Sequence, residues 1–415
     1  MNAAALLGHP GLRQILELLN ENGEEARVVG GAVRNTLLGE PIHEYDIATT
    51  AVPDAVIARA KKAGLRAIPT GIAHGTVTLI AQGMPFEVTT LREDVETDGR
   101  HAVIRFGRDF AADAVRRDFT INALSLGLDG ELHDYTGGIA DLTARRVRFI
   151  GDARQRIRED YLRVLRFFRF SAAYGGPALD REGLGAAIAE RAGLAILSAE
   201  RVRQELFKIL AAPRAASVAA IMSEAGILGP LLHGVARPAR LARLIAFGDD
   251  VDPLLRLAAL AVAIPEDVLR LRDILRLSNP ETARLERAAR ALATLHGLSA
   301  PPSLGDLRRL LFEAGRQGAR DALRLAFADS GAEMDKSRWH AALRFVTDTP
   351  EPRLPFSGAD LLARGLAPGR GLGEALKILQ ANWIRAGFPQ DPRSLAALLD
   401  DATQAAPGPA EKSDR

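Results

Sequence analysis

The chain has 415 residues, of which 47% are hydrophobic and 26% charged, and its formal net charge is +2. This length and composition predict a soluble protein of two or three packing units. The chain contains no cysteine, which excludes disulfides and thiolate metal sites and is typical of a reducing cytoplasm. Without a signal-like N-terminus or a membrane-length apolar stretch, we expect a cytoplasmic protein that has no membrane contact and no implied protein partner.

The first part of the chain, residues 1–145, is predicted to form a mixed α/β domain whose core begins near residue 26. Helices are expected at 32–38 and 53–62. Strands are expected where β-branched or alternating apolar residues recur, at 26–29, 45–48, 75–80, 86–91, 103–106, 123–128 and 131–135. Asp129-Gly130 between the last two strands predicts a hairpin.

The rest of the chain is predicted to be helical, because it is rich in Ala, Leu, Arg and Glu at helical spacing. We expect a neck at 146–215, a body and tail at 216–402, and disorder over the small, polar residues 403–415. Between residues 145 and 170 there are nine arginines and three acids. This excess indicates a surface for a polyanion, although a solvated helix face is the commoner meaning of such a charge run.

A glycine pair and two carboxylates form the most informative pattern. Gly30 and Gly31 lie between a predicted strand and a predicted helix, where backbone N–H groups can approach phosphates, and Arg34 follows one turn later. Glu44 and Asp46 are two apart, so on a strand they share a face. Carboxylates on one rigid element suit Mg²⁺, and the combination predicts a site for a triphosphate and a metal.

Two further segments carry candidate polar residues. Glu87 alternates with inward-facing neighbours on a predicted strand, and it is equally well interpreted as a catalytic base or as a surface charge. In the segment 116–123, Arg117 is a candidate phosphate ligand, and Asp118 and Asn122 are candidate partners of sugar hydroxyls. A salt-bridged helix terminus is the structural alternative for this segment.

The fourth element places Asp160, Arg163, Arg166 and Arg169 at helical spacing, which predicts one polar ridge. An aspartate accepts from an exocyclic amine and an arginine donates to a ring nitrogen. Asp160 and Arg163 together could therefore recognise the Watson–Crick edge of either cytosine or adenine. From spacing alone, an intrahelical ladder of salt bridges is the better-supported interpretation.

These four elements, followed by SAERVRQEL at 198–206, resemble the class II tRNA nucleotidyltransferase and bacterial poly(A) polymerase family over roughly the first half of the chain. The resemblance implies an α+β fold: a polymerase-β-like nucleotidyltransferase head with a small mixed sheet, then an all-helical neck, body and tail that bind tRNA. The implied substrates are CTP and ATP, and the implied cofactor is Mg²⁺, as two ions.

The resemblance also assigns roles to the candidate residues. It implies metal binding and catalysis by the carboxylates Glu44 and Asp46. Glu87 stays a catalytic candidate on its place in the predicted strand alone. It implies nucleotide binding by Gly30, Gly31, Arg34, Arg117, Asp118, Asn122, Asp160, Arg163, Arg166 and Arg169.

Two positions depart from the family pattern, which usually has Asp where this chain has Glu44 and Asn35. The extra methylene of Glu44 moves its carboxylate, and a displacement of roughly 1 Å at a reacting centre can cost about a hundredfold in rate. Glutamate also binds Mg²⁺, and we expect both departures to be tolerated.

The expected activity is addition of C, C and A to the 3′ end of tRNA. Residues 92–101 resemble the flexible loop that full CCA-adding enzymes use to switch from C to A, and the C-terminus lacks the long basic extension of poly(A) polymerases. The alternatives are poly(A) addition, partial addition of CC or A, and a non-catalytic RNA-binding homologue.

Overall fold

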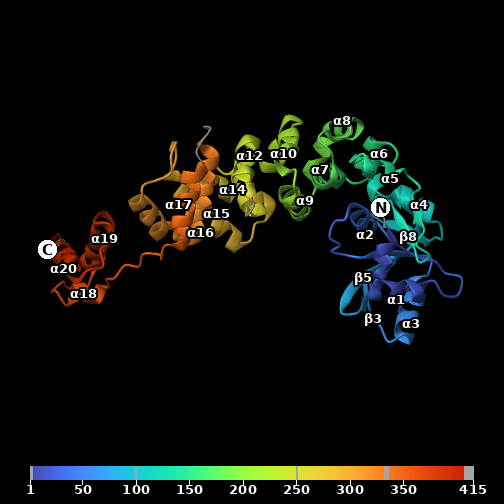
Figure 1. Cartoon of the computed structure of the whole chain (residues 1–415), viewed down its shortest axis with the longest axis horizontal. Coiled ribbons are helices and arrows are strands. Elements are labelled where there is room, and N and C mark those ends of the chain that lie inside the picture. The colour runs from blue at the N-terminus through green and yellow to red at the C-terminus, as the bar shows by residue number, and fades with distance from the viewer. Residues whose placement is uncertain (1–2, 99–100, 249–250, 331–335, 406–415) are drawn as a thin grey trace, which may run out of the picture. The chain divides into compact units, whose positions relative to one another are not determined.

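The computed structural model describes residues 3–98, 101–248, 251–330 and 336–405 (Figure 1). The chain divides into two compact units, Met1–Leu231 and Leu232–Arg415, and each buries apolar side chains of its own. The first unit contains every predicted site residue, and the second consists of helices.

The first unit is built on a seven-stranded mixed sheet in the order β3-β4-β5-β2-β1-β8-β9. Its strands are β1 (Ala26–Val29), β2 (Asp46–Thr49), β3 (Arg66–Gly71), β4 (Thr76–Ala81), β5 (Met84–Thr90), β8 (Ser125–Gly127) and β9 (Leu132–His133). The pair β2–β5 is parallel and every other neighbouring pair is antiparallel. A separate antiparallel pair consists of β6 (Arg92–Asp98) and β7 (His101–Phe106).

Helices around this sheet bury one apolar stripe each. In α1 (Pro10–Leu19) the His9 Nδ1 accepts from the Leu12 N–H at 3.2 Å and caps the N-terminus, and the residues Leu12, Ile15, Leu16 and Leu19 are buried. The other elements of residues 1–145 are η1 (Ala3–Gly8), α2 (Gly31–Leu38), α3 (Pro53–Lys62), η2 (Ile72–His74), α4 (Phe110–Arg116), η3 (Thr120–Asn122) and α5 (Gly138–Thr143).

Only helices follow within the first unit. They are α6 (Ala153–Glu159), α7 (Leu162–Tyr174), α8 (Arg181–Ala189), η4 (Arg191–Ile196), α9 (Ala199–Ala211), α10 (Ala215–Glu224) and α11 (Leu228–Leu232), which reaches the boundary of the unit. Phe119 packs on Phe149 and Phe170 of this unit, with ring centroids 4.7 and 5.3 Å apart. This aromatic contact holds α7 beside the segment that carries Asp118 and Asn122.

In the described residues of the second unit, the regular elements are all helices, joined by loops. Its helices are α12 (Pro238–Phe247), α13 (Pro253–Ala261), α14 (Pro265–Leu275), α15 (Asn279–Ala293), α16 (Leu304–Asp329), α17 (Lys336–Asp348), α18 (Gly358–Leu362), α19 (Arg370–Arg385) and α20 (Pro392–Ala405). Gly315, at φ 67°, kinks α16. Among the described residues, no helix is both long and apolar enough to span a membrane.

The α+β fold class is confirmed, and several local expectations need correction. The strand β2 begins at Asp46, so Glu44 lies in the loop before the sheet and not on the strand. A flexible loop was expected at 92–101 and a strand at 103–106. The structure instead pairs β6, at 92–98, with β7, at 101–106. Residues 99–100 lie outside the described residues. The helix α20 extends to Ala405, and 406–415 are likewise outside the described residues.

Candidate active site

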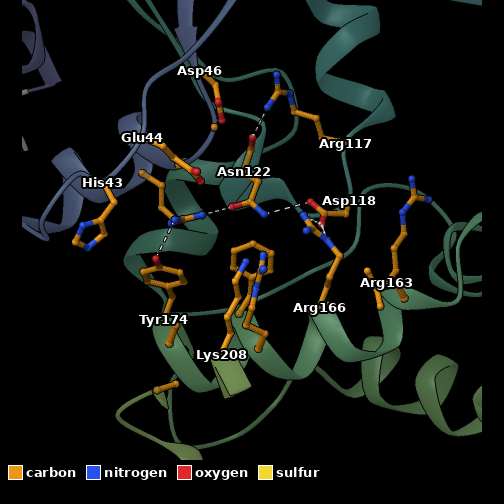
Figure 2. Close-up of a pocket in the computed structure, with 18 of the residues that line it drawn as sticks. His43, Glu44, Asp46, Arg117, Asp118, Asn122, Arg163, Arg166, Tyr174 and Lys208 are labelled. Atoms are coloured by element: carbon orange, nitrogen blue, oxygen red, sulfur yellow. Dashed lines mark hydrogen bonds and ion pairs between the residues drawn. The ribbon is translucent and has the colours of Figure 1, made fainter. Parts of the chain in front are cut away.

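A pocket of about 940 Å³ lies in the first unit, lined by residues of α2, β2, α4, η3, α7 and α9 and of the segments beside them (Figure 2). The structure brings together at this pocket both predicted metal ligands and all of the predicted nucleotide-binding residues. They are Glu44, Asp46, Gly30, Gly31, Arg34, Arg117, Asp118, Asn122, Asp160, Arg163, Arg166 and Arg169. Glu87 lies instead at a smaller adjoining pocket of about 360 Å³, which shares Glu44, Asp46 and Arg117 with the larger one.

The carboxylates belong to two strands and a loop. Asp46 begins β2 and lies directly beside Glu87 in the parallel register of β2 and β5, so both side chains leave the same face of the sheet. Tyr45 and Ile47, on the opposite face, are buried. Glu44 is exposed in the preceding loop. The sheet therefore fixes two of the three acids, and the loop provides the third.

The surroundings of Asp46 raise its proton affinity. Burial raises the pKa of Asp46 from 3.8 to about 6, and the negative charges of Glu44 and Glu87 add to this effect, while Arg117 acts against it. A carboxylate that faces two others with only partial compensation by an arginine is suited to a cation.

The donor set fits Mg²⁺ bound jointly by protein and nucleotide. Within the described part of the chain, no group of three or more His, Asp or Glu side chains is arranged to hold a metal by itself. Mg²⁺ commonly takes one or two carboxylates and completes its octahedron with phosphate oxygens and water. Glu44 and Asp46, which line the larger pocket, supply such a pair.

The glycine turn opens α2 at the edge of the pocket. Gly30 has φ 69° and ψ −123°, a conformation that non-glycine residues rarely adopt, and its N–H donates to the Leu124 carbonyl at 3.0 Å. A Cβ at Gly30 would lie 3.1 Å from Nη1 of Arg117. Glycine therefore lets α2 begin here and leaves room for the arginine.

Arg34 is a buried cation inside the pocket wall. Its side chain donates to Oδ1 of Asn35. It also donates to Oδ1 of Asn122 and, at 2.9 Å, to the hydroxyl of Tyr174, and both of these partners are labelled in Figure 2. Only 6% of Arg34 is exposed, and burial lowers its pKa, an effect that Tyr174 and Asp118 oppose. A guanidinium held in this way is preorganised for a phosphate oxygen.

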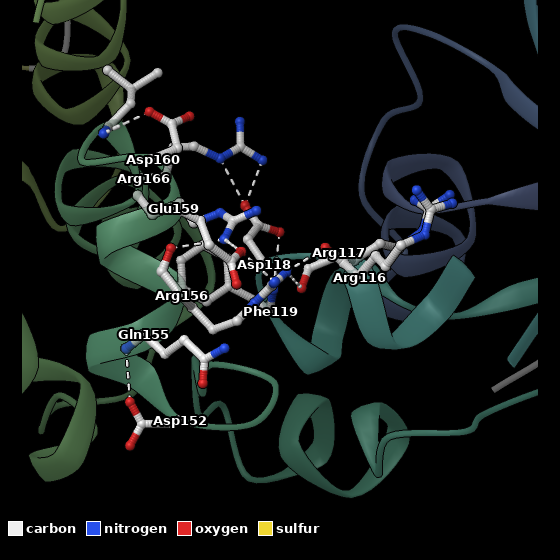
Figure 3. Close-up of polar contacts among 12 residues, drawn as sticks. Arg116, Arg117, Asp118, Phe119, Asp152, Gln155, Arg156, Glu159, Asp160 and Arg166 are labelled. Carbon is white, nitrogen blue, oxygen red and sulfur yellow. Dashed lines mark hydrogen bonds and ion pairs between the residues drawn. The ribbon is translucent and has the colours of Figure 1, made fainter. Parts of the chain in front are cut away.

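A chain of polar contacts crosses from α4 to α7. Arg117 donates to Asp113 at 3.1 Å and to the Asn122 carbonyl at 3.3 Å. Asp118 accepts from the Asn122 amide at 3.2 Å (Figure 2) and from Nε of Arg166 at 2.7 Å (Figure 3). Asp118 and Asn122 are both 7% exposed. These buried, mutually bonded groups give the predicted phosphate and ribose contacts fixed positions.

Asp160 and Arg163 line the pocket, but not as one polar ridge. Asp160 ends α6 with φ −155°, outside the helical region, and α7 begins at Leu162. Its carboxylate accepts from Arg201 at 2.8 Å and from the Leu162 N–H at 3.1 Å. Arg163 instead donates to Glu159 at 2.6 Å. The helix break places the two side chains on different partners, which helical spacing did not predict.

Phe170 provides an apolar surface beneath three cations. The guanidinium carbons of Arg34, Arg166 and Arg169 lie 5.3, 5.3 and 4.2 Å from its ring centroid. Arg169 also pairs with the buried Glu205 at 2.9 Å, and burial lowers its pKa. The aromatic ring spaces the arginines without neutralising them, so the pocket stays positive.

Several pocket residues were missed from the sequence, namely His43, Arg116, Tyr174, Arg201 and Lys208. Tyr174 follows Arg163 by eleven positions, about three helical turns, so the ridge could have been extended to it. Arg201 and Lys208 are seven positions apart on α9, about two turns. That α9 faces the pocket depends on tertiary packing, for which the sequence has no local signal.

Two family models match this chain. Residues 26–148 match the poly A polymerase head domain, and residues 182–237 match a model described as the probable RNA and SrmB-binding site of polymerase A. The first match covers the sheet and the glycine turn. The second begins within α8 and extends past α11, to residue 237.

Similar proteins and structures agree with these matches. The mitochondrial CCA tRNA nucleotidyltransferase 1 of Mus musculus is 34% identical over 94% of this chain and 89% of its own length, and a CCA-adding enzyme of Limosilactobacillus fermentum is 32% identical over 95% and 97%. The Bacillus stearothermophilus CCA-adding enzyme in complex with CTP superposes with a TM-score of 0.74, at 28% identity over 96% and 98% of the two chains. The Thermotoga maritima CCA-adding enzyme complexed with tRNA shares the fold, with a TM-score of 0.71 at 20% identity over 97% and 98%. On the identity and coverage of these relatives, the chain belongs to the CCA tRNA nucleotidyltransferase family.

Proposed function

We propose that this protein adds C, C and A to the 3′ end of tRNA, without a template, from CTP and ATP and with release of pyrophosphate. The observation that supports this most is the single pocket that joins carboxylates, the glycine turn and the arginines of α7. Relatives that match over nearly the whole chain are named for CCA addition. The absence of cysteine supports a reducing compartment, and we place the reaction in the cytoplasm.

The reaction forms one P–O bond and breaks another. The oxygen of the tRNA 3′-hydroxyl attacks the α-phosphorus, the bond to the bridging oxygen of the β-phosphate breaks, and pyrophosphate leaves with that electron pair. Glu44 and Asp46 would hold Mg²⁺, which when bound lowers the pKa of a hydroxyl and neutralises phosphate charge. Arg34 and Arg117 bind the triphosphate oxygens, and the N-terminus of α2 directs backbone N–H groups toward them.

The smaller pocket supports a role for Glu87 in proton transfer. Glu87 lies beside Asp46 and is exposed to this second pocket, to which α7 contributes no residue. A hydroxyl that enters through the second pocket would meet both Glu87 and the carboxylates Glu44 and Asp46. We therefore assign Glu87 as the group that accepts the hydroxyl proton.

Base selection is assigned to Asp160 and Arg163. On the Watson–Crick edge, cytosine and adenine each present an amine donor beside a ring-nitrogen acceptor, whereas the ring nitrogen of uracil and guanine on that edge is itself a donor. A carboxylate accepts from the amine and a guanidinium donates to the ring nitrogen, so one pair of side chains can select both nucleotides. The contacts of Asp160 with Arg201 and of Arg163 with Glu159 hold the two side chains until a base arrives.

A second candidate function is poly(A) addition, because the head matches a model described as a poly A polymerase domain. The test uses Mg²⁺, CTP and ATP with three RNAs: tRNA lacking CCA, tRNA ending in CC, and unstructured oligo(A). Addition of CCA to the first and of A to the second, followed by arrest, is expected. Long A-tails on all three would identify a poly(A) polymerase. No extension despite tRNA binding would indicate a non-catalytic homologue.

A further inference from the structure

Asn35 and Tyr174 connect the two walls of the nucleotide pocket, although neither has a role in the reaction described above. Oδ1 of Asn35 accepts from Nε and Nη2 of Arg34 at 3.1 and 2.9 Å. The Tyr174 hydroxyl accepts from Nη2 of Arg34 at 2.9 Å and donates to Oδ1 of Asn35 at 3.3 Å. The last residue of α7 is thereby bonded to the first turns of α2.

Asn35 also holds the loop that leads to Glu44. Its Nδ2 donates to the Pro41 carbonyl at 2.7 Å, and its own backbone carbonyl accepts from the Glu40 N–H at 2.9 Å. The amide side chain uses its acceptor on Arg34 and its donor on the loop. A carboxylate of the same shape could keep the first contact but has no hydrogen with which to make the second.

The position of Arg34 depends on such contacts, because it is buried. Besides the bonds above, Asn122 accepts from Nη1, and the ring of Tyr174 lies 4.1 Å from the guanidinium carbon. A buried cation whose partner is removed loses both a hydrogen bond and its orientation. Small displacements of groups that bind reacting phosphates have large kinetic effects.

We propose that Asn35 and Tyr174 are positioning residues with separate targets: Tyr174 fixes the guanidinium of Arg34 for the triphosphate, and Asn35 fixes the loop that carries Glu44 for the divalent cation. This inference rests on the proposed function, since it takes the pocket to be a nucleotide and metal site. Neither residue touches substrate in this assignment; each acts through the residue that it holds.

Two conservative variants separate the targets. Tyr174→Phe keeps the ring and removes the hydroxyl, so we expect CTP to bind about 3- to 10-fold more weakly, as the loss of its hydrogen bond to Arg34 predicts. Binding of Mn²⁺, measured by electron paramagnetic resonance, should stay within about twofold of the wild-type value. A change of that size is smaller than the effect expected from one lost hydrogen bond. Asn35→Asp should give the reverse pattern, with Mn²⁺ binding weakened about 10-fold by displacement of the loop.

The sign of the second effect is diagnostic. Asn35→Asp adds a negative charge near the carboxylates, and charge alone would strengthen cation binding. Weaker Mn²⁺ binding therefore reports the lost Pro41 contact. Unchanged or tighter Mn²⁺ binding in this variant would overturn the role of Asn35, and unchanged CTP binding in Tyr174→Phe would overturn that of Tyr174.

Tyr135→Phe is the matched control. The Tyr135 hydroxyl accepts from Nη1 of Arg27 at 2.9 Å, the same type of bond in the same unit, but neither residue lines the nucleotide pocket. This variant should bind CTP and Mn²⁺ like the wild type. Wild-type tRNA extension is measured in parallel: if it fails, the proposed function fails, whereas the binding measurements still decide the roles of Asn35 and Tyr174.

Discussion

Asp46→Asn is expected to stabilise the metal-free protein while abolishing nucleotide addition. At neutral pH the native state holds Asp46 charged, although burial and the neighbouring carboxylates raise its pKa from 3.8 to about 6. A shift of about 2 units at ~1.4 kcal/mol each corresponds to about 3 kcal/mol of native-state destabilisation. Asparagine has the same shape and no charge, so it removes this cost.

The pH dependence separates this effect from other consequences of the substitution. A raised aspartate pKa means that the native state binds the proton more tightly than the unfolded chain does. The cost is therefore fully present above the native pKa of about 6, and it declines as the pH falls toward 3.8. Between pH 7.5 and pH 5 the stability gap between variant and wild type should shrink by about 1.4 kcal/mol.

Urea unfolding in EDTA, followed by far-UV circular dichroism at both pH values, measures the gap. Both tryptophans, Trp339 and Trp383, lie in Leu232–Arg415, so their fluorescence reports that unit alone and should be unchanged by the substitution. The exposed Asp54 supplies a control, and Asp54→Asn should show no such pH-dependent gap. Equal gaps at pH 7.5 and pH 5 for Asp46→Asn would refute the reasoning.

Two other substitutions test the arginines of α7. Arg163→Ala should reduce discrimination of CTP against UTP about tenfold or more, with less effect on phosphate binding, since it removes a base-edge donor. Competition between the two nucleotides in single-turnover extension measures this discrimination. Unchanged selectivity would contradict base recognition by α7. Glu205→Ala leaves Arg169 buried without its partner and should destabilise the protein by about 3–5 kcal/mol. Urea unfolding is the assay, Glu205→Gln should lose less, and an alanine variant as stable as the wild type would show that the ion pair contributes little.

The sequence predicted elements well where one local signal dominates. The strand 26–29 and the helix 53–62 were predicted with the observed bounds, because a buried β-branched run and a proline at the start of a helix are strong signals. The strand β3 was missed because it is an edge strand with mostly exposed or half-buried residues and no apolar alternation. Local patterns report burial, and an edge strand buries little.

The sequence predicted which residues line the pocket better than it predicted which residues they contact. Residues 26–49 and 116–122 approach one another because β1 pairs with both β2 and β8, which no spacing along the chain specifies. The break between α6 and α7 at Asp160 contains neither glycine nor proline, so helical periodicity continued through it in the prediction. The partners of Asp160 and Arg163 consequently depend on α9 and α6, and only the folded structure identifies them.

The location of Glu44 explains how a glutamate can serve at this position. Asp46 is fixed by register between Val29 and Glu87 within β2, whereas Glu44 precedes that strand, between the contact of Asn35 with Pro41 and the bond of the Glu87 N–H to the Tyr45 carbonyl at 3.0 Å. A loop can absorb one methylene by a small shift, but a central strand cannot. Glu44→Asp is therefore expected to keep single-turnover CTP addition within about tenfold, and Asp46→Glu to lose about a hundredfold or more. Equal losses in the two variants would mean that the loop is as rigid as the sheet.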